Sequence, residues 1–220
     1  MTNPDTKQRI LDAAEALFAD KGFAETSLRA LTQAADVNLA AVHYHFGSKE
    51  RLFVQVLGRI IAPVNAERLH LFDELEAKTS ELQLEDVLRA FLQPAMALAA
   101  CGDERATHLR QLMGRLQSQS SKMQEEFKEI FREVLMRFAA LISRTVPGLE
   151  PATLVWRIHF LIGSMVFTFG DPQGIEQMSQ GMCKVDGGSA HCEQMVTAFA
   201  GAFRAPAPDS QPSPTNSPRA

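Results

Sequence analysis

Residues 26–52 read TSLRALTQAADVNLAAVHYHFGSKERL, which predicts two short helices joined by a tight turn and followed by a third helix. Ser27, Asn38 and Ser48 are residue types whose side-chain oxygen accepts a backbone N–H at a helix start. Apolar residues follow the first cap at helical spacing, at Leu28, Leu31, Ala34 and Ala35. The second helix is predicted over 39–45 and ends at Phe46-Gly47. Two compact helices joined by a turn of about three to four residues form a helix-turn-helix, whose second helix enters the DNA major groove.

Two cations in this stretch also favour DNA as the partner. Arg29 and Lys49 both fall in the first turn of a predicted helix. A cation there opposes the helix dipole by about 0.3–1 kcal/mol, so a further partner is expected. A phosphate is suitable because helix N-termini present N–H groups to anions. The alternative is that both are solvated cations with no role.

Three runs of this segment carry a family resemblance. T-S-L-R-x-L, A-A-D-V-N and V-H-Y-H-F-G-S-K-E-x-L together resemble the N-terminal domain of TetR/AcrR-type transcriptional regulators, over roughly the first quarter of the chain. The resemblance implies phosphate contacts by Ser27, Tyr44, His45 and Lys49, and positions near base edges for Arg29, Leu39, Ala40 and His43. The DNA-binding set also includes Asn38, the cap of the recognition helix. Two residues depart from the family pattern: Asp36 stands in the turn where Gly is usual, and His43 occupies a position often held by Tyr.

Composition and charge limit the class of protein. The chain has 220 residues, of which 45% are hydrophobic, and a net charge of −4. Residues 1–60 carry seven Lys/Arg and seven Asp/Glu, so DNA binding must depend on where few cations point and on a dimer doubling them. Three cysteines without a CxxC motif predict reduced thiols. Charges near the N-terminus interrupt any signal peptide, so a cytoplasmic location is expected.

The helical pattern predicts an all-α chain with a boundary at Pro63. We expect a three-helix DNA-binding domain over 1–48, whose first helix ends at Gly22 with Phe23 packed behind it. A linking helix follows over 49–62. The helical ligand-binding and dimerisation domain occupies 63–204, and the Pro/Ser-rich residues 205–220 are expected to be disordered.

Three segments of the second domain support specific expectations. Pro94 predicts a kink or break near 92–93 in the helix over 84–101. The apolar stripe over 123–142 predicts one continuous helix. Residues 154–169 are apolar nearly all round but short for a membrane span, so we expect this helix to be buried between its own domain and a second subunit. Homodimerisation through the C-terminal helices, with no membrane partner, would lead to recognition of a palindrome.

Many Phe and Met side chains of the second domain could line a pocket for a long apolar ligand, since Met adapts to varied shapes. Spacing alone favours the alternative, which is that they form ordinary core. Two later stretches, HLRQLMGRLQSQSSKMQEEFKEIF and LVWRIHFLIG, resemble PsrA-like members of the same family, which respond to fatty acids or acyl-CoA. By that analogy Arg110, Arg115 or Arg157 would meet a carboxylate or thioester head group. The apolar candidates are Phe91, Met96, Met113, Phe131, Phe138, Phe160 and Phe167.

Other chemistry has little support in the sequence. His43 and His45 are about 200° apart around a helix and cannot share a metal. Cys183, His191 and Cys192 match no zinc spacing, so neither a metal nor a cofactor is expected. Gly-rich phosphate loops, GxSxG and HExxH are missing from the sequence, which disfavours an enzyme.

The sequence therefore predicts a repressor that binds palindromic operator DNA and is released by an apolar effector such as a fatty acid or acyl-CoA. The alternatives are a regulator of efflux or stress genes with a different hydrophobic ligand, a helical lipid-binding module that does not bind DNA, and an acyl-thioester enzyme. Activation in place of repression also stays open.

Overall fold

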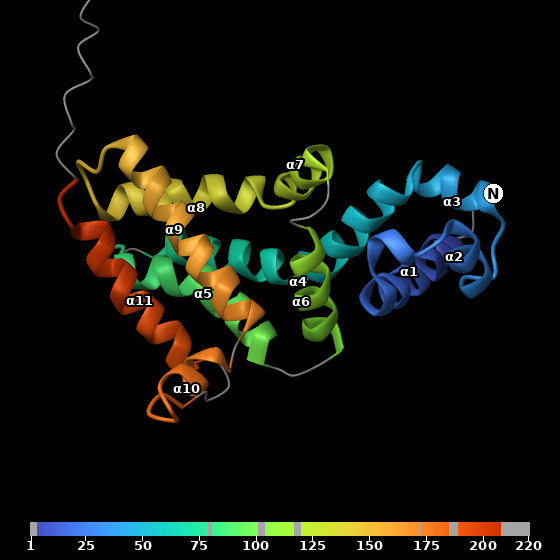
Figure 1. The fold of residues 1–220 in the computed structure, drawn as a ribbon. Coiled ribbons are helices and arrows are strands. Elements are labelled where there is room, and N and C mark those ends of the chain that lie inside the picture. Colours follow the sequence, from blue (N-terminus) through green and yellow to red (C-terminus); the bar gives the residue numbers. More distant parts are fainter. Residues whose placement is uncertain are drawn as a thin grey trace, which may run out of the picture.

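The computed structural model describes residues 4–78, 81–100, 104–116, 120–171, 173–184 and 189–207, with the backbone alone at 4 and at 114–116. Every regular element in these ranges is an α-helix, which confirms the all-α prediction. Figure 1 shows α1, α2 and α3 at one end, α10 and α11 at the other, and α4 running between the two ends.

The helix-turn-helix forms as its caps predict. Helices α1 (Pro4–Glu25), α2 (Leu28–Ala34) and α3 (Leu39–Phe46) form the first unit. The Ser27 hydroxyl accepts from the Ala30 amide at 3.1 Å, and the Asn38 side chain accepts from the Ala41 amide at 2.8 Å. Each bond satisfies a backbone donor that the helix leaves unpaired, and so fixes where that helix begins.

Gly22 and Phe23 close α1 onto the unit's core. Gly22 has a φ of 88°, a left-handed conformation that interrupts the regular helix. The Phe23 ring then lies 6.0 Å from Phe18 and 5.4 Å from Phe53 of the next helix, centroid to centroid. The predicted packing of Phe23 behind Gly22 is confirmed, and it joins α1 to the start of α4.

Helix α4 (Lys49–Ala77) does not end at Pro63 as the sequence predicts. Its 29 residues continue through the proline. Proline removes one helical hydrogen bond and crowds the preceding turn. Here the ring is exposed, while Ile61 and Arg68 are buried on the opposite side. Packing along this buried side offsets the local loss, so the expected linking helix over 49–62 is only the first half of α4.

Two further boundaries differ from the prediction. Helix α5 (Leu84–Ala100) continues through Pro94 without a break, because its buried stripe packs along the whole length. The single helix expected over 123–142 is divided into α7 (Ser121–Glu129) and α8 (Arg132–Thr145). The carbonyl of Ile130, at the turn between them, accepts a hydrogen bond from the Asn65 side chain at 3.0 Å. A buried side chain of α4 therefore stabilises the interruption.

The remaining helices complete the second unit. They are α6 (Glu104–Leu116), α9 (Pro151–Gly170), α10 (Gly174–Met178) and α11 (Ser189–Arg204). Helix α11 packs along α5, and two ion pairs join them: Arg89 with Glu193 at 2.7 Å and Arg204 with Glu85 at 2.5 Å.

Helix α9 has two unlike sides. By length and composition it could cross a membrane, a criterion that core helices of soluble proteins also meet, and 39% of its most apolar window is buried. Leu154, Ile158 and Leu161 are buried in the core of the second unit. Its other side exposes apolar residues, so within this chain the helix is buried on one side only.

Candidate functional site

Helix α3 presents one packed side and one free side. Val42 and Phe46 are buried against the helix-turn-helix core. Leu39 is 47% exposed and Tyr44 is 73% exposed, although both are large and apolar or aromatic. Ala40 and His43 are exposed with them. These side chains belong to the set that the sequence predicts to contact base edges and phosphates.

Seven of the nine predicted DNA-binding residues are exposed, and the other two are half-buried. His45 is half-buried, with its ring centroid 5.2 Å from that of Tyr44. The Lys49 ammonium lies 4.4 Å from the centroid of the Phe23 ring, and partial burial lowers the pKa of this side chain. Lys49 is therefore held in position at the N-terminus of α4, whereas Arg29 extends from α2 into solvent.

Asp36 explains how the turn forms without the usual glycine. Its φ is 48°, in the left-handed region that Asp tolerates better than most residues. Arg9 of α1 donates to the Asp36 carbonyl at 2.7 Å and to its carboxylate at 2.9 Å. This side-chain clamp compensates for the unfavourable backbone conformation and ties the turn to α1.

The second unit contains an apolar cavity with two lobes. The first, of about 420 Å³, lies between α4, α6 and α9, and the second, of about 380 Å³, extends towards α5, α7 and α8. Ligand sites typically have volumes of about 300–1,000 Å³. The residues that line both lobes are Arg68, Met113, Phe131, Met165 and Val166.

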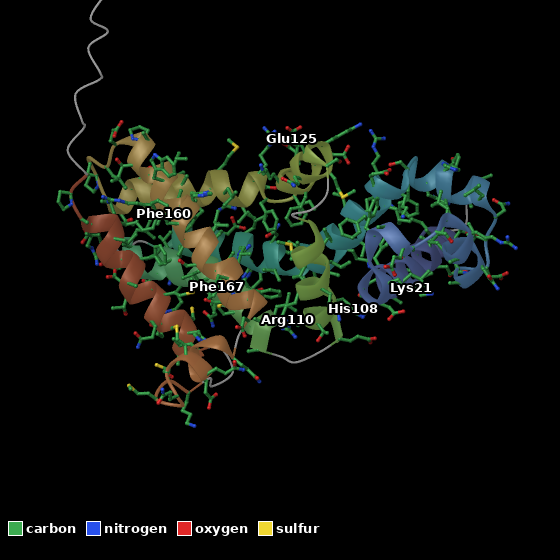
Figure 2. All side chains as sticks on the ribbon, viewed as in Figure 1. Lys21, His108, Arg110, Glu125, Phe160 and Phe167 are labelled. Atoms are coloured by element: carbon green, nitrogen blue, oxygen red, sulfur yellow. The ribbon has the colours of Figure 1, made fainter. Side chains whose placement is uncertain are left out.

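Five of the ten predicted ligand residues line this cavity. Arg110 and Phe167 line the first lobe, and Phe91 lines the second. Met113 and Phe131 line both. Figure 2 shows Arg110 on α6 and Phe167 on α9.

Four more of the predicted ligand residues lie elsewhere. Met96 is 2% exposed in the core on α5, and Phe138 stacks on Phe91 at 4.2 Å behind the cavity wall. Phe160 is 57% exposed on the outer side of α9 (Figure 2). Arg157 is buried and donates to the carbonyls of Phe203, Ala205 and Pro206 at 2.8–3.1 Å, so it binds backbone and not a head group.

These bonds also correct the expected start of the tail, since residues 205–207 are described and two of them are held by Arg157. Residues 208–220 and the side chain of Arg115 lie outside the described residues.

Arg68 is a cavity residue that the sequence did not single out. Its side chain is 1% exposed and lines both lobes. A signal was present, because Arg68 falls on an apolar helical stripe: Val64 and Phe72 lie four residues away from it, and Ile61 lies seven residues away. The predicted helix end at 62 separates Arg68 from the start of that stripe.

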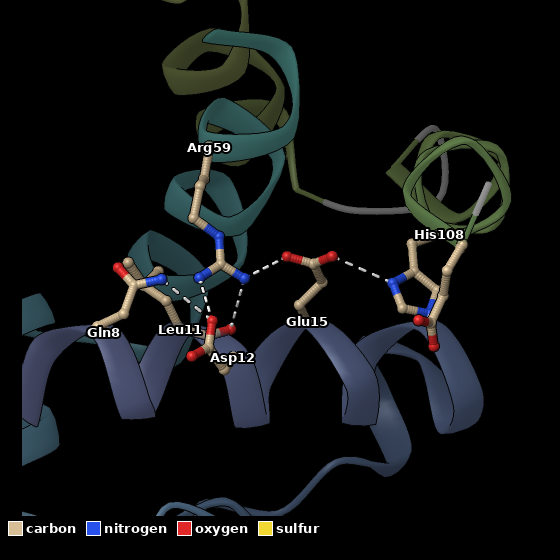
Figure 3. A network of polar contacts seen from close by, with 7 residues as sticks. Gln8, Leu11, Asp12, Glu15, Arg59 and His108 are labelled. Carbon is tan, nitrogen blue, oxygen red and sulfur yellow. Dashed lines mark hydrogen bonds and ion pairs between the residues drawn. The ribbon is translucent and has the colours of Figure 1, made fainter. Parts of the chain in front are cut away.

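A polar network joins the two units across α1, α4 and α6 (Figure 3). Arg59 of α4 donates to Asp12 at 2.5 Å and also pairs with Glu15, both on α1. The other oxygen of Glu15 lies 3.2 Å from Nδ1 of His108 on α6. Burial lowers the pKa of Arg59, but the bonds to Glu15 and Asp12 outweigh it and raise the pKa overall. The first unit is therefore connected to the helix that carries Arg110 and Met113.

Among the described residues, no three His, Cys, Asp or Glu side chains are grouped so as to hold a metal. Cys192 is buried, which raises the pKa of its thiol, and Cys183 is exposed. Cys101 lies outside the described residues.

Comparison with known proteins gives matches over both units. Residues 10–56 match the family described as "Bacterial regulatory proteins, tetR family", and residues 89–202 match "Tetracyclin repressor-like, C-terminal domain". The transcriptional repressor NicS of Pseudomonas putida is 40% identical over 76 residues, which are 33% of this chain and 36% of NicS. The repressor AcnR of Corynebacterium efficiens is 33% identical over 89 residues, 40% of this chain and 42% of AcnR. The chain thus matches well under half the length of each of these relatives.

Two solved structures share the fold along nearly the whole chain. The fatty acid degradation regulator FadR from Bacillus halodurans has a TM-score of 0.62 at 14% identity and covers 93% of this chain and 98% of its own. FadR from Bacillus subtilis, solved in complex with stearoyl-CoA, has a TM-score of 0.64 at 14% identity, with 89% and 98% covered. The C-terminal family match spans more than half of the 220 residues, and the chain belongs to the TetR family of bacterial regulatory proteins.

Proposed function

We propose that this protein is a transcriptional repressor that binds palindromic operator DNA as a homodimer and is released by an apolar effector. The exposed side of α3 carries the DNA-binding part of the proposal. Leu39 and Tyr44 are held in solvent by a helix whose opposite side is fully packed. This arrangement leaves apolar surface exposed to water in the free protein, which is unfavourable. Contact with a DNA groove would cover that surface.

The outer side of α9 supports the homodimer. Val155, Trp156 and Phe160 are 57–66% exposed, and the Trp156 and Phe160 rings stack at 5.7 Å. Gly163 and Ser164 follow on the same side and are small enough for a second helix to approach closely. An exposed apolar strip of this kind is typical of a subunit interface.

The two-lobed cavity and the α1–α4–α6 network support control by a ligand. A ligand in the first lobe contacts Arg110 and Met113 of α6, and His108 of the same helix contacts Glu15 of α1. A ligand that prefers one position of α6 would shift the orientation of the DNA-binding unit by its difference in affinity for the two states. The proposal of a fatty acid or acyl-CoA draws on the apolar lining and on the fold shared with the two FadR proteins.

Selection from a random pool of duplex DNA tests the first part of this proposal. We expect enrichment of a palindrome, and its release from the protein by a medium-chain apolar ligand such as decanoate. Met113→Trp should place a bulky ring where the two lobes meet, so operator binding should persist while release is lost. Met136→Trp, on the exposed side of α8, is the matched control. Failure to enrich any sequence would refute operator binding, and release that survives Met113→Trp would place the effector elsewhere.

A further inference from the structure

Arg68 is a buried cation whose hydrogen-bond partners are all neutral. Its Nε donates to the Phe91 carbonyl at 2.8 Å, and Nη1 donates to the Asn65 side chain at 3.2 Å. Nη2 lies 3.4 Å from the sulfur of Met165. The structure places no carboxylate of the described residues in an ion pair with it. Burial lowers its pKa to about 10, so the guanidinium is still charged at neutral pH.

Two arginines that are less buried than Arg68 are paired with carboxylates. Arg59 is bound by Asp12 and Glu15, and Arg89 is bound by Asp86 and Glu193, although both are more exposed than Arg68. Burying a charge without a counter-charge is costly, and the cost is normally removed by a partner. The most buried of these three arginines is thus the one without a carboxylate in the described part of the chain.

The position of Arg68 identifies where such a partner would lie. The side chain lines both lobes, so the guanidinium borders the space between them. A guanidinium has five N–H donors in a planar fork, and the three contacts above leave two of them for a further acceptor. A planar carboxylate matches this fork better than a single oxygen does.

The other cations around the cavity are less suited to this role. Arg110 is half-buried and already donates to the Ala99 carbonyl and the Thr107 hydroxyl. Asp171 lines the same lobe and opposes an anion there. Lys128, in the second lobe, is exposed, so water already solvates its charge. An anion gains most where the cation is least solvated, which is at Arg68.

We propose that Arg68 binds the carboxylate of an apolar free acid whose chain occupies the lobes of this cavity. The inference rests on the proposed function, since it concerns the head group of the proposed apolar effector. An acyl-CoA carries an uncharged thioester at the end of its acyl chain and places its phosphates far from it. Such an ester cannot present a carboxylate to Arg68, so the structure favours the free acid.

Calorimetric titration with three ligands of one chain length tests this inference. Decanoate, decan-1-ol and decanoyl-CoA are titrated at neutral pH into the purified protein. We expect the acid to bind about ten- to a hundredfold more tightly than the alcohol, the range for hydrogen bonds between charged groups. Arg68→Met should abolish this preference, and Arg68→Lys should keep part of it. Arg144→Met, which removes an exposed arginine of α8, should leave the preference unchanged.

Each outcome separates the inference from the wider proposal. Equal binding of acid and alcohol to the unmodified protein would overturn the role of Arg68 while leaving an apolar effector in place. A preference that disappears in Arg110→Met and persists in Arg68→Met would move the head group to Arg110. Tighter binding of decanoyl-CoA than of decanoate would overturn the inference that the ligand is a free acid. If none of the three ligands binds, the effector proposal itself fails. Should Arg68→Met not fold, judged by circular dichroism, the unmodified protein and Arg68→Lys still decide the question.

Discussion

Arg29 and Lys49 both lie in the first turn of a helix, but their side chains have different surroundings. Lys49 lies against the Phe23 ring and 3.5 Å from the Ala24 carbonyl, so its ammonium has a defined position. Arg29 is exposed and free to reach towards a base edge. A fixed cation suits a phosphate, whose position is the same for every DNA sequence. A long exposed arginine suits guanine, which presents two acceptors in the major groove.

Replacement of Lys49 and replacement of Arg29 should therefore weaken DNA binding in different ways. Lys49→Met should weaken binding to operator and random DNA alike. It should also reduce the salt dependence of the affinity by the amount that corresponds to about one lost phosphate contact. Arg29→Ala should weaken binding to the operator by about 1–3 kcal/mol and relax its base preference. Fluorescence anisotropy across a salt series measures both, with Lys184→Ala, near α10, as the control for loss of one positive charge. If both variants bound DNA as tightly as the unmodified protein at every salt concentration, neither residue would belong to the DNA interface.

The role of a single residue can be predicted from the sequence when its partners are close to it along the chain. Ser27, Asn38 and Ser48 cap helices through bonds three residues away, and such local chemistry can be read from the sequence. Arg68 and Arg157 cannot be distinguished in this way. Both are arginines on apolar helices, and only the arrangement of α5, α9 and α11 decides that one borders the cavity and the other binds backbone.

Among the elements, helix identity was predictable and helix ends next to proline were not. Pro63 and Pro94 both suggested breaks, yet α4 and α5 continue through them. Conversely, the apolar stripe over 123–142 contains no breaker, yet the chain turns at 130–131. In each case tertiary packing outweighs local preference, and the Asn65 bond to the Ile130 carbonyl is a contact between residues 65 positions apart. The cavity lies between these helices, so its lining was predicted only in part.

The contact between α6 and α1 should transmit the effect of a ligand. His108→Ala removes the side chain that faces Glu15, while Arg59 keeps its bond to Asp12. We expect ligand affinity to stay near that of the unmodified protein and operator release to become much weaker, because typical couplings of about 1–3 kcal/mol depend on such contacts. Paired titrations of ligand and operator measure this. His191→Ala, on α11, should leave release intact; full release in His108→Ala would show that the signal takes another route.

The α5–α11 ion pairs should make stability depend on acidity. The bond from Arg204 lowers the pKa of Glu85, and the bond from Arg89 lowers the pKa of Glu193, relative to the usual 4.5. A carboxyl group whose pKa is lower when folded stabilises the protein above its unfolded pKa and loses this effect as pH falls through the folded pKa.

Urea unfolding from neutral pH to about pH 3 measures this dependence. We expect the midpoint to decrease below pH 4.5, and to decrease less steeply in Glu85→Gln, which is already weaker at neutral pH. An identical slope in the variant would show that other carboxyl groups govern acid unfolding.

For the whole molecule, the proposed dimer determines how the DNA-binding units are spaced. One protomer presents one α3, whereas a palindrome offers two half-sites about 34 Å or a multiple of that apart. A second protomer on the outer side of α9 would bury Trp156 and Phe160 and set that spacing. The same dimer would double the few cations of residues 1–60, whose charges otherwise balance.

Charges placed on this side of α9 should separate the protomers. The double variant Trp156→Glu and Phe160→Glu should be monomeric in light scattering and should lose most of its affinity for the palindrome. Its helical content should not change, because both side chains are exposed in one protomer. Met178→Glu, on α10 and 78% exposed, is the control for an added charge at an exposed methionine. A double variant that stays dimeric would assign the interface to another surface.

The unbroken course of α4 through Pro63 has a geometric consequence. A helix rises 1.5 Å per residue, so Lys49 lies about 21 Å along the axis from the proline, and Arg68 lies about 7.5 Å from it on the other side. Proline is the usual centre of sharp helix bends, which exceed about 20°. A change of that size at Pro63 would displace Lys49 by about 7 Å, roughly twice the longest hydrogen bond. A bend at Pro63 would therefore act over two unequal lengths of helix, and a small movement beside the cavity would become a shift of several ångströms at the end of α4 that carries Lys49.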